Sequence, residues 1–205
     1  MQRKFAWILV LSILALLPAC GSKEEAPAPA ADPEPVVEEP GPLAAVAVLK
    51  PRADNEASGT ITFTETDGGV EVVADIARVS PGMHGIHLHA VGDCSAEDFT
   101  STGGHFNPTD APHGAPTDAV RHAGDFGNIE IGEDGAGRLT LVTDMLTVAD
   151  GPYTVVGRAI ILHEGEDDLE SQPTGAAGGR LVRAPGAARG GPRRQPDSRL
   201  SGDRR

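Results

Sequence analysis

Short apolar stretches that alternate with polar residues recur along most of the chain and predict an all-β fold. The clearest example surrounds Ile61 and Phe63, which lie two residues apart and therefore share one face of an extended strand. An Asp-Gly-Gly sequence at residues 67–69 follows, and such a sequence is typical of a hairpin turn. Further strands are expected over residues 43–49, 70–79, 84–89, 128–131, 139–142 and 153–162. Helical spacing is not sustained within these regions, which favours an antiparallel sandwich or barrel.

The first 42 residues lack this strand pattern. Residues 1–19 join a short basic start to an apolar stretch that is too short for a comfortable membrane span, which predicts a secretory signal peptide. Cys20 follows a Leu-Pro-Ala sequence and resembles the lipidation site of bacterial lipoproteins. An ordinary signal peptide with an incidental cysteine is the alternative. Residues 20–42 are then expected to be the lipidated cysteine and a disordered linker rich in Ala, Pro and Glu.

This organisation predicts where the protein resides. A lipid on Cys20 would anchor residues 43–182, one domain of ordinary size, in the periplasm at a bacterial membrane. Gly21, rather than an acidic residue, follows the cysteine. By resemblance to lipoprotein sorting, that position favours the outer membrane.

Charge separates the domain from the end of the chain. The whole chain carries −13, whereas residues 183–205 hold seven Arg and two Asp, a net +5, so that the remainder carries −18. Because nucleic acid repels such a charge, a nucleic-acid partner for the domain is not expected. Residues 183–205 are predicted to be a basic, disordered tail.

All seven histidines lie between residues 84 and 163. Two of them, His87 and His89, are two apart on an expected strand, so that both side chains can bind one ion from the same face. Imidazole ligands suit copper and zinc, and an added carboxylate suits zinc. Residues 90–125 form an expected loop whose length suggests function. This loop and the later strand end supply the remaining candidate ligands His105, His113, His122, Asp125 and His163.

The motifs around these histidines resemble the successive blocks of the copper/zinc superoxide dismutase family. The resemblance runs in order over residues 43–181 and implies a Greek-key antiparallel β-sandwich or barrel of about eight short strands. That architecture is immunoglobulin-like, with long metal-binding and electrostatic loops. The matching blocks are Gly85-Ile86-His87-Leu88-His89, Gly92-Asp93-Cys94, Gly104–Pro108, Arg121–Asn128, Gly157–Glu164 and Gly178–Leu181.

The resemblance also implies a role for each site residue. Asp167 matches a carboxylate that hydrogen-bonds one copper-ligand and one zinc-ligand histidine, and Arg180 matches an arginine beside the open copper position. His84 matches a histidine of the core. His105 would be the imidazolate that bridges the two metals. Copper would be bound by His87, His89, His105 and His163, and zinc by His105, His113, His122 and Asp125.

The implied activity is dismutation of superoxide to dioxygen and hydrogen peroxide at a copper centre, with Arg180 and His105 as catalytic residues and zinc in a structural role. One alternative is a periplasmic copper- and zinc-binding protein without turnover. Another is an inactive homologue destabilised by its altered C-terminus. Arg180 favours the enzyme, because metal storage needs no cation beside an open copper position. Superoxide and, through the anchor, a membrane are the expected partners, and a homodimer is one open oligomeric state.

The sequence departs from the family pattern after Leu181. The family continues there with a small residue, a cysteine that pairs with the one matching Cys94, and an apolar strand. Here the chain becomes rich in Arg, Pro and Gly, so the disulfide partner is absent and the last strand is expected to be missing. Two explanations stay open: an out-of-frame translation, or a genuine basic tail that binds an anionic lipid or polymer.

Overall fold

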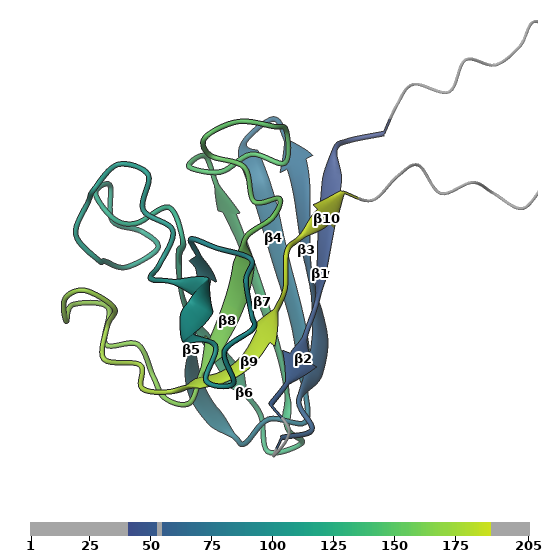
Figure 1. Cartoon of the computed structure of the whole chain (residues 1–205), viewed down its shortest axis with the longest axis vertical. Coiled ribbons are helices and arrows are strands. Elements are labelled where there is room, and N and C mark those ends of the chain that lie inside the picture. Colours follow the sequence, from purple (N-terminus) through teal and green to yellow (C-terminus); the bar gives the residue numbers. More distant parts are fainter. Residues whose placement is uncertain (1–40, 53–54, 190–205) are drawn as a thin grey trace, which may run out of the picture. The chain divides into compact units, whose positions relative to one another are not determined.

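The computed structural model describes residues 41–52 and 55–189, and these form two antiparallel β-sheets that pack face to face (Figure 1). The predicted all-β sandwich is therefore confirmed. The expected signal peptide, Cys20, the linker as far as residue 40 and the tail after residue 189 lie outside the described residues. Within those residues the single helical element is the three-residue 3-10 turn η1, Thr100–Thr102, and no helix is long and apolar enough to cross a bilayer.

Each sheet contains five strands. The first has the order β10-β1-β3-β4-β7 and the second the order β2-β9-β8-β5-β6. The first sheet consists of β1 (Ala44–Val48), β3 (Ser58–Thr66), β4 (Gly69–Ala77), β7 (Ala136–Thr143) and β10 (Ala188–Arg189). The second consists of β2 (Lys50–Pro51), β5 (Gly82–His89), β6 (Asp125–Ile131), β8 (Ala159–His163) and β9 (Arg180–Ala184).

The first sheet is regular because its strands alternate buried and exposed residues, as their sequences predict. The pairing of β3 with β4 runs without a register shift from Ser58, opposite Ala77, to the turn after Thr66. Phe63 is fully buried on the inner face, and its ring lies 6.4 Å from that of Phe126 in the second sheet. Burial of such inward residues from both sheets forms one core between them.

The central strand of the second sheet, β8, is buried on both faces. In β8, Ile160 and Leu162 belong to the core between the sheets, whereas Ile161 and His163 point to the opposite face. All five residues of β8 are nevertheless buried, since the long connections 90–124 and 164–179 cover that outer face. The strand is shorter than the expected stretch 153–162 and begins at Ala159.

The structure corrects the expected C-terminal boundary. The strand β9 continues to Ala184, and β10 then pairs with β1 through Ala188 and Arg189, so the last strand is short rather than missing. Val182 and Ala184 are fully buried, which explains why the chain stays in the sheet beyond residue 182. Ordered structure thus includes residues 183–189, which the sequence assigned to the tail.

Candidate metal centre

Strand irregularities place the candidate copper ligands. His87 and His89 point out of the core, while the alternating residues Ile86 and Leu88 point into it. The pairing of β5 with β6 shifts register between Gly85 and His87, and the pairing of β8 with β9 shifts between Leu162 and His163. Because a bulge redirects the side chains beside it, both shifts occur where ligand histidines must turn toward a common point.

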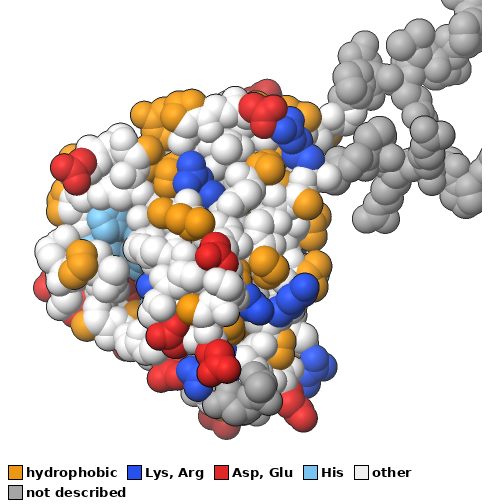
Figure 2. Space-filling view, in the orientation of Figure 1, with side chains coloured by type: hydrophobic (Ala, Val, Ile, Leu, Met, Phe, Trp, Pro, Cys, Tyr) orange, Lys and Arg blue, Asp and Glu red, His pale blue; other side chains and the backbone are white. Residues whose placement is uncertain are grey.

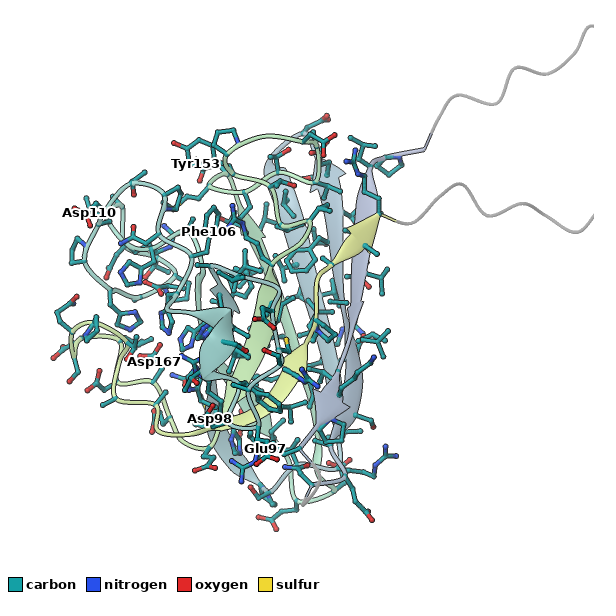
Figure 3. All side chains as sticks on the ribbon, viewed as in Figure 1. Glu97, Asp98, Phe106, Asp110, Tyr153 and Asp167 are labelled. Atoms are coloured by element: carbon teal, nitrogen blue, oxygen red, sulfur yellow. The ribbon has the colours of Figure 1, made fainter. Side chains whose placement is uncertain are left out.

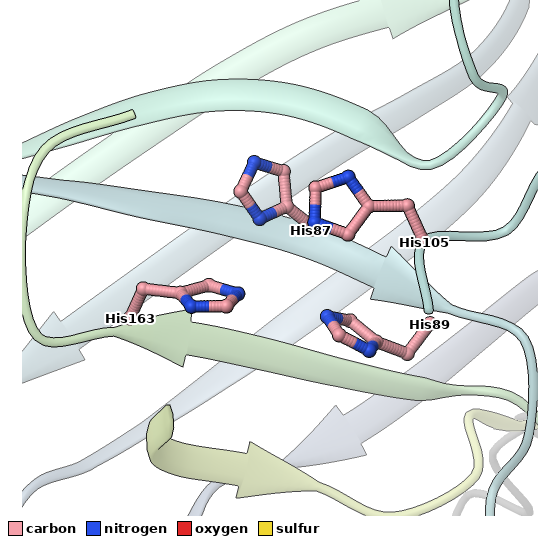
Figure 4. A group of neighbouring side chains, drawn as sticks. All are labelled: His87, His89, His105 and His163. Carbon is pink, nitrogen blue, oxygen red and sulfur yellow. The ribbon is translucent and has the colours of Figure 1, made fainter. Parts of the chain in front are cut away.

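Four imidazole rings converge on the outer face of the second sheet (Figure 4). The rings of His87 and His105 are stacked with centroids 3.8 Å apart, and His105 joins the sheet through a bridge to His89. One nitrogen of each ring is buried and has no hydrogen-bond partner: Nδ1 of His87 and Nε2 of His89, His105 and His163. The ligand atoms of this group lie within 4.8 Å of one another. A buried polar atom without a partner is costly, so the four nitrogens fit a bound copper ion.

The second nitrogen of these rings is held by the protein. Nε2 of His87 lies 2.7 Å from Oδ2 of Asp167, and Nδ1 of His89 lies 2.9 Å from the carbonyl oxygen of Gly103. Nδ1 of His163 lies 3.2 Å from the carbonyl oxygen of Gly178. Each oxygen accepts a hydrogen bond from the ring N–H, so that it fixes the tautomer and leaves the other nitrogen free for a metal.

The second group surrounds Asp125. Its Oδ1 lies 2.8 Å from Nδ1 of His105, 3.1 Å from Nδ1 of His113 and 3.2 Å from Nδ1 of His122. Tetrahedral zinc with bonds of about 2.0 Å separates neighbouring ligand atoms by roughly 3.3 Å, so this group fits zinc. The other oxygen of Asp125 accepts hydrogen bonds from the backbone N–H groups of Gly114 and His122, both at 3.1 Å. His105 belongs to both groups, through Nε2 to the first and Nδ1 to the second.

Asp167 connects the two groups, and Figure 3 shows it beside the histidine rings. Its side chain is buried and reaches His87 through Oδ2 and Nε2 of His113 through Oδ1, at 3.0 Å. Gly175 makes this placement possible, since its φ is +69° and a Cβ there would lie 1.7 Å from the same Oδ1. The structure thus brings Asp167 together with the two histidines that the resemblance implied.

Burial sets the charge state of the rings. Desolvation lowers the pKa of His87 to about 3, of His89 to about 2 and of His163 to about 4, and it also lowers the pKa of His105. Burial alone would raise the pKa of Asp125, but its hydrogen bond with His105 and the nearby histidines lower it. At neutral pH the rings are therefore neutral and the carboxylate is charged, which is the state that binds metal.

Arg180 lies at the edge of the copper-side group. Its Nη1 donates hydrogen bonds to the carbonyl oxygen of Phe99 and to Oγ1 of Thr102, and its Nη2 donates to the carbonyl oxygen of Gly103 at 2.8 Å. The same Gly103 oxygen accepts a hydrogen bond from Nδ1 of His89. One carbonyl group therefore links the guanidinium to a candidate copper ligand.

The two remaining candidates lie outside both groups. His84 is buried in the sheet, where Nδ1 lies 2.9 Å from the carbonyl oxygen of His163 and Nε2 lies 3.0 Å from that of Ser80. Cys94 is a free thiol whose Sγ donates to the carbonyl oxygen of Gly92. In the space-filling view, histidine surface is visible only beside the long loops (Figure 2).

Sequence reasoning missed several residues that hold the site together. The side chain of Asn128 pairs with both the N–H and the carbonyl group of Asp167, each at 2.8 Å. Gln172 does the same for the backbone of His113, accepting at 2.8 Å and donating at 2.9 Å. Both amides join segments that are far apart in sequence, so spacing gave no signal for either. Asn128 does stand within a matching block, and that position alone could have marked it.

Comparisons with known proteins agree with this geometry. The sequence model of the copper/zinc superoxide dismutase family matches residues 57–185, more than half of the chain. A solved structure described as the clock protein EA4 is similar at 40% sequence identity and a TM-score of 0.64. That similarity covers 72% of this chain and 95% of the other. The chain therefore belongs to the copper/zinc superoxide dismutase family.

Proposed function

We propose that this protein dismutates superoxide, converting two superoxide anions and two protons into dioxygen and hydrogen peroxide. The observation that carries the proposal is the arrangement around Gly103, whose carbonyl oxygen accepts hydrogen bonds from both His89 and Arg180. A guanidinium is thereby fixed beside four buried imidazole nitrogens that lack partners. Metal storage requires those nitrogens but not the guanidinium, so this arrangement favours an enzyme over a storage protein.

Copper would be bound by His87, His89, His105 and His163 and would supply the one-electron redox chemistry, while zinc would be bound by His105, His113, His122 and Asp125. Arg180 attracts the small anion and orients it through N–H groups that its backbone contacts leave available. The zinc-side group holds Nδ1 of His105, so that Nε2 is the atom at which this ring takes up and delivers a proton. Asp167 keeps the rings of His87 and His113 from turning.

The direct test measures dismutation together with metal content, using the purified protein loaded with both metals. We expect Arg180→Ala to keep both metals and to lose roughly 10- to 100-fold in rate, the size of one charge-assisted contact. Arg180→Lys should fall between this variant and the wild type. Full binding of copper and zinc without turnover by the wild type would favour the alternative of a metal-binding protein.

Long-range attraction of superoxide is expected to be weak. Residues 164–179, which follow the last candidate ligand, contain no Lys or Arg, and acidic and basic side chains are interspersed on the face seen in Figure 2. The rate should therefore fall only modestly with added salt. A steep decrease in stopped-flow measurements would contradict weak steering.

We also propose that the protein is anchored in the periplasm through a lipid on Cys20, with the outer membrane favoured. The support is the sequence of residues 1–21. Labelling with a radioactive fatty acid should mark the wild type and not Cys20→Ser, and this variant should move from the membrane to the soluble fraction. Equal labelling of both proteins would contradict the proposal.

A further inference from the structure

A second arginine of β9, Arg183, holds the segment that precedes the candidate copper ligand His105. Its Nη1 donates a hydrogen bond to the carbonyl oxygen of Cys94, and its guanidinium carbon lies 4.9 Å from the ring centroid of Phe99. The first contact fixes the start of the segment and the second fixes Phe99, five residues further on. Glu97 and Asp98, labelled in Figure 3, belong to the same segment.

The register of β9 explains why both arginines reach this segment. Residues three apart in a regular strand point to opposite faces. Arg180 and Arg183, however, pair with His163 and Ile161, which lie two apart on β8, because the register shift inserts one extra residue, Leu181. The bulge therefore places both guanidinium groups on the face of the sheet that carries His163.

Phe99 is the point at which the contacts of the two arginines meet. Its ring is buried and lies under Arg183, whereas its carbonyl oxygen accepts a hydrogen bond from Arg180. Its φ of +61° is a left-handed conformation that a bulky residue rarely adopts without support. The 3-10 turn η1 follows at once and delivers Thr102 and Gly103, the other two acceptors of Arg180.

The packing around residues 94–99 is incomplete. A cavity of about 560 Å³ lies beside them, and it is lined by Pro51 and Arg52 on one side and by Arg183 on another. Cys94 forms no disulfide within the described residues, so no covalent bond joins this segment to the sheet there. The contacts of Arg183 supply a connection between Cys94 and β9.

We propose that Arg183 is a positioning residue for Arg180. By holding Cys94 and Phe99, it keeps the carbonyl groups of Phe99 and Gly103 where they orient the guanidinium of Arg180 and the ring of His89. The inference rests on the proposed function, since it assigns Arg183 to the orientation of the same small anion. It also makes a claim about residues 94–103 that can be tested without turnover.

The test compares Arg183→Met, which keeps most of the side-chain length but loses the donors and the charge, with Arg183→Lys and with the wild type, all as full chains loaded with both metals. Arg138→Met is the matched control, because Arg138 lies on the first sheet in an exposed ion pair with Asp75. Three quantities are measured: amide hydrogen exchange of residues 94–103, the affinity of azide for the copper(II) protein, and the dismutation rate at low and high ionic strength. Azide serves as a small anion that binds copper.

We expect Arg183→Met to accelerate exchange of the amides of Phe99, Thr102 and Gly103 about three- to tenfold, the effect of losing one hydrogen bond. Azide affinity and the dismutation rate should fall by a similar factor at both ionic strengths. Arg183→Lys should recover much of the loss, since lysine can still donate to Cys94. Arg138→Met should match the wild type in all three measurements.

Three results would overturn the inference: unchanged exchange and azide affinity in Arg183→Met, a loss of rate that disappears at high ionic strength, or an equal loss in Arg138→Met. The second result would mean that Arg183 acts through its charge. If Arg183→Met does not fold, Phe99→Leu removes the ring contact alone and should shift exchange and azide affinity in the same direction. If exchange is faster in Arg183→Met but the metal-loaded wild type is inactive, the positioning role of Arg183 would be supported and the proposed function would be refuted.

Discussion

The two sheets of the sandwich have five strands each but differ in how regularly those strands pair. The first sheet pairs β3 with β4 and β4 with β7 without a register shift, and its inward residues alternate with outward ones. The second sheet shifts register twice, once before His87 and once before His163. Regular pairing forms a continuous ladder of hydrogen bonds between neighbouring strands and keeps their inward residues in the core, whereas a bulge leaves a residue unpaired and redirects its neighbours. Stability is therefore expected to come mainly from the first sheet and metal chemistry from the second.

The difference between the two sheets should be most evident in how the stability of the protein depends on pH. In the metal-free protein, burial lowers the pKa of His87 to about 3, of His89 to about 2 and of His163 to about 4. As the pH falls below about 6.5, the unfolded chain binds protons before the folded one does, so the stability of the fold decreases. Each ring contributes about 1 kcal/mol between pH 6.5 and 5.5, hence roughly 3 kcal/mol for three rings. Urea unfolding at several pH values, with and without chelator, measures this loss.

The first sheet should respond to acid in a lower pH range. Glu65 at the end of β3 accepts hydrogen bonds from Oγ1 of Thr147 and from the N–H groups of Ala149 and Val148, and these contacts lower its pKa from 4.5. Its contribution is present above pH 4.5 and is lost only below that value. A stability of the metal-free protein that stays flat from pH 7 to 5.5 would contradict the assignment of acid sensitivity to the second sheet.

A cavity in the first sheet should lower stability by a similar amount. Phe63 is fully buried, and Phe63→Ala should lower the free energy of unfolding by about 3–5 kcal/mol. The metal content of the protein that remains folded should not change, because Phe63 belongs to the core between the sheets, whereas the copper-side rings lie on the outer face of the second sheet. Val142→Ala is the control on the same sheet: this side chain is 55% exposed, and its loss should cost less than about 0.5 kcal/mol. Equal costs for the two variants would refute the role given to this core.

Asp167→Asn should produce the opposite result, with metal affinity reduced and the fold kept. The amide oxygen can accept a hydrogen bond from one ring N–H, but the amide presents its own N–H groups to the second ring, so that only one of the two histidine contacts survives. Zinc affinity should fall about 10- to 100-fold in competition with a chelator. Asp168→Asn removes the same charge from an exposed side chain that hydrogen-bonds Ser171, and it should bind zinc like the wild type. If both variants lost zinc affinity equally, the effect would be due to the change in net charge.

The smallest effect is expected for an ion pair on the surface of the first sheet. Nη1 of Arg138 lies 2.6 Å from Oδ1 of Asp75 on the neighbouring strand, yet both side chains are more than half exposed. Solvent screens such pairs, so Arg138→Ala should change stability by less than about 0.5 kcal/mol in thermal unfolding. A loss above about 1 kcal/mol would show that the regular sheet depends on surface charge as well as on its core.

The sequence predicted the regular sheet well and the irregular one in part. The alternation around Ile61 and Phe63 corresponds to β3, since successive residues of a half-buried strand point alternately to the core and to the solvent. The same rule placed His87 and His89 on one face. The strand 153–162 was predicted too long because Tyr153 to Val156 are aromatic or β-branched, as strand residues often are, although they form turns and isolated bridges.

The features that escaped prediction depend on register or on distant pairing. Arg180 and Arg183 share a face only because Leu181 is an extra residue in the pairing of β9 with β8. The strand β10 consists of Ala188 and Arg189 only, which is too short for an alternating pattern. It is recognised as a strand only because it pairs with β1. Gln172 reaches the backbone of His113 across 59 residues of sequence. Local patterns contain no information about such contacts.

The first and the last described segments of the domain each contribute strands to both sheets, and this has a practical consequence. Residues 44–48 run beside residues 188–189 in the first sheet, and Lys50 and Pro51 run beside Val182 and Arg183 in the second. The described ends of the domain therefore emerge as antiparallel neighbours, within reach of a short peptide. A circular permutant that joins them and opens a tight turn such as residues 67–68 is expected to keep every strand pairing, and it offers a route to attach cargo at a turn of the first sheet.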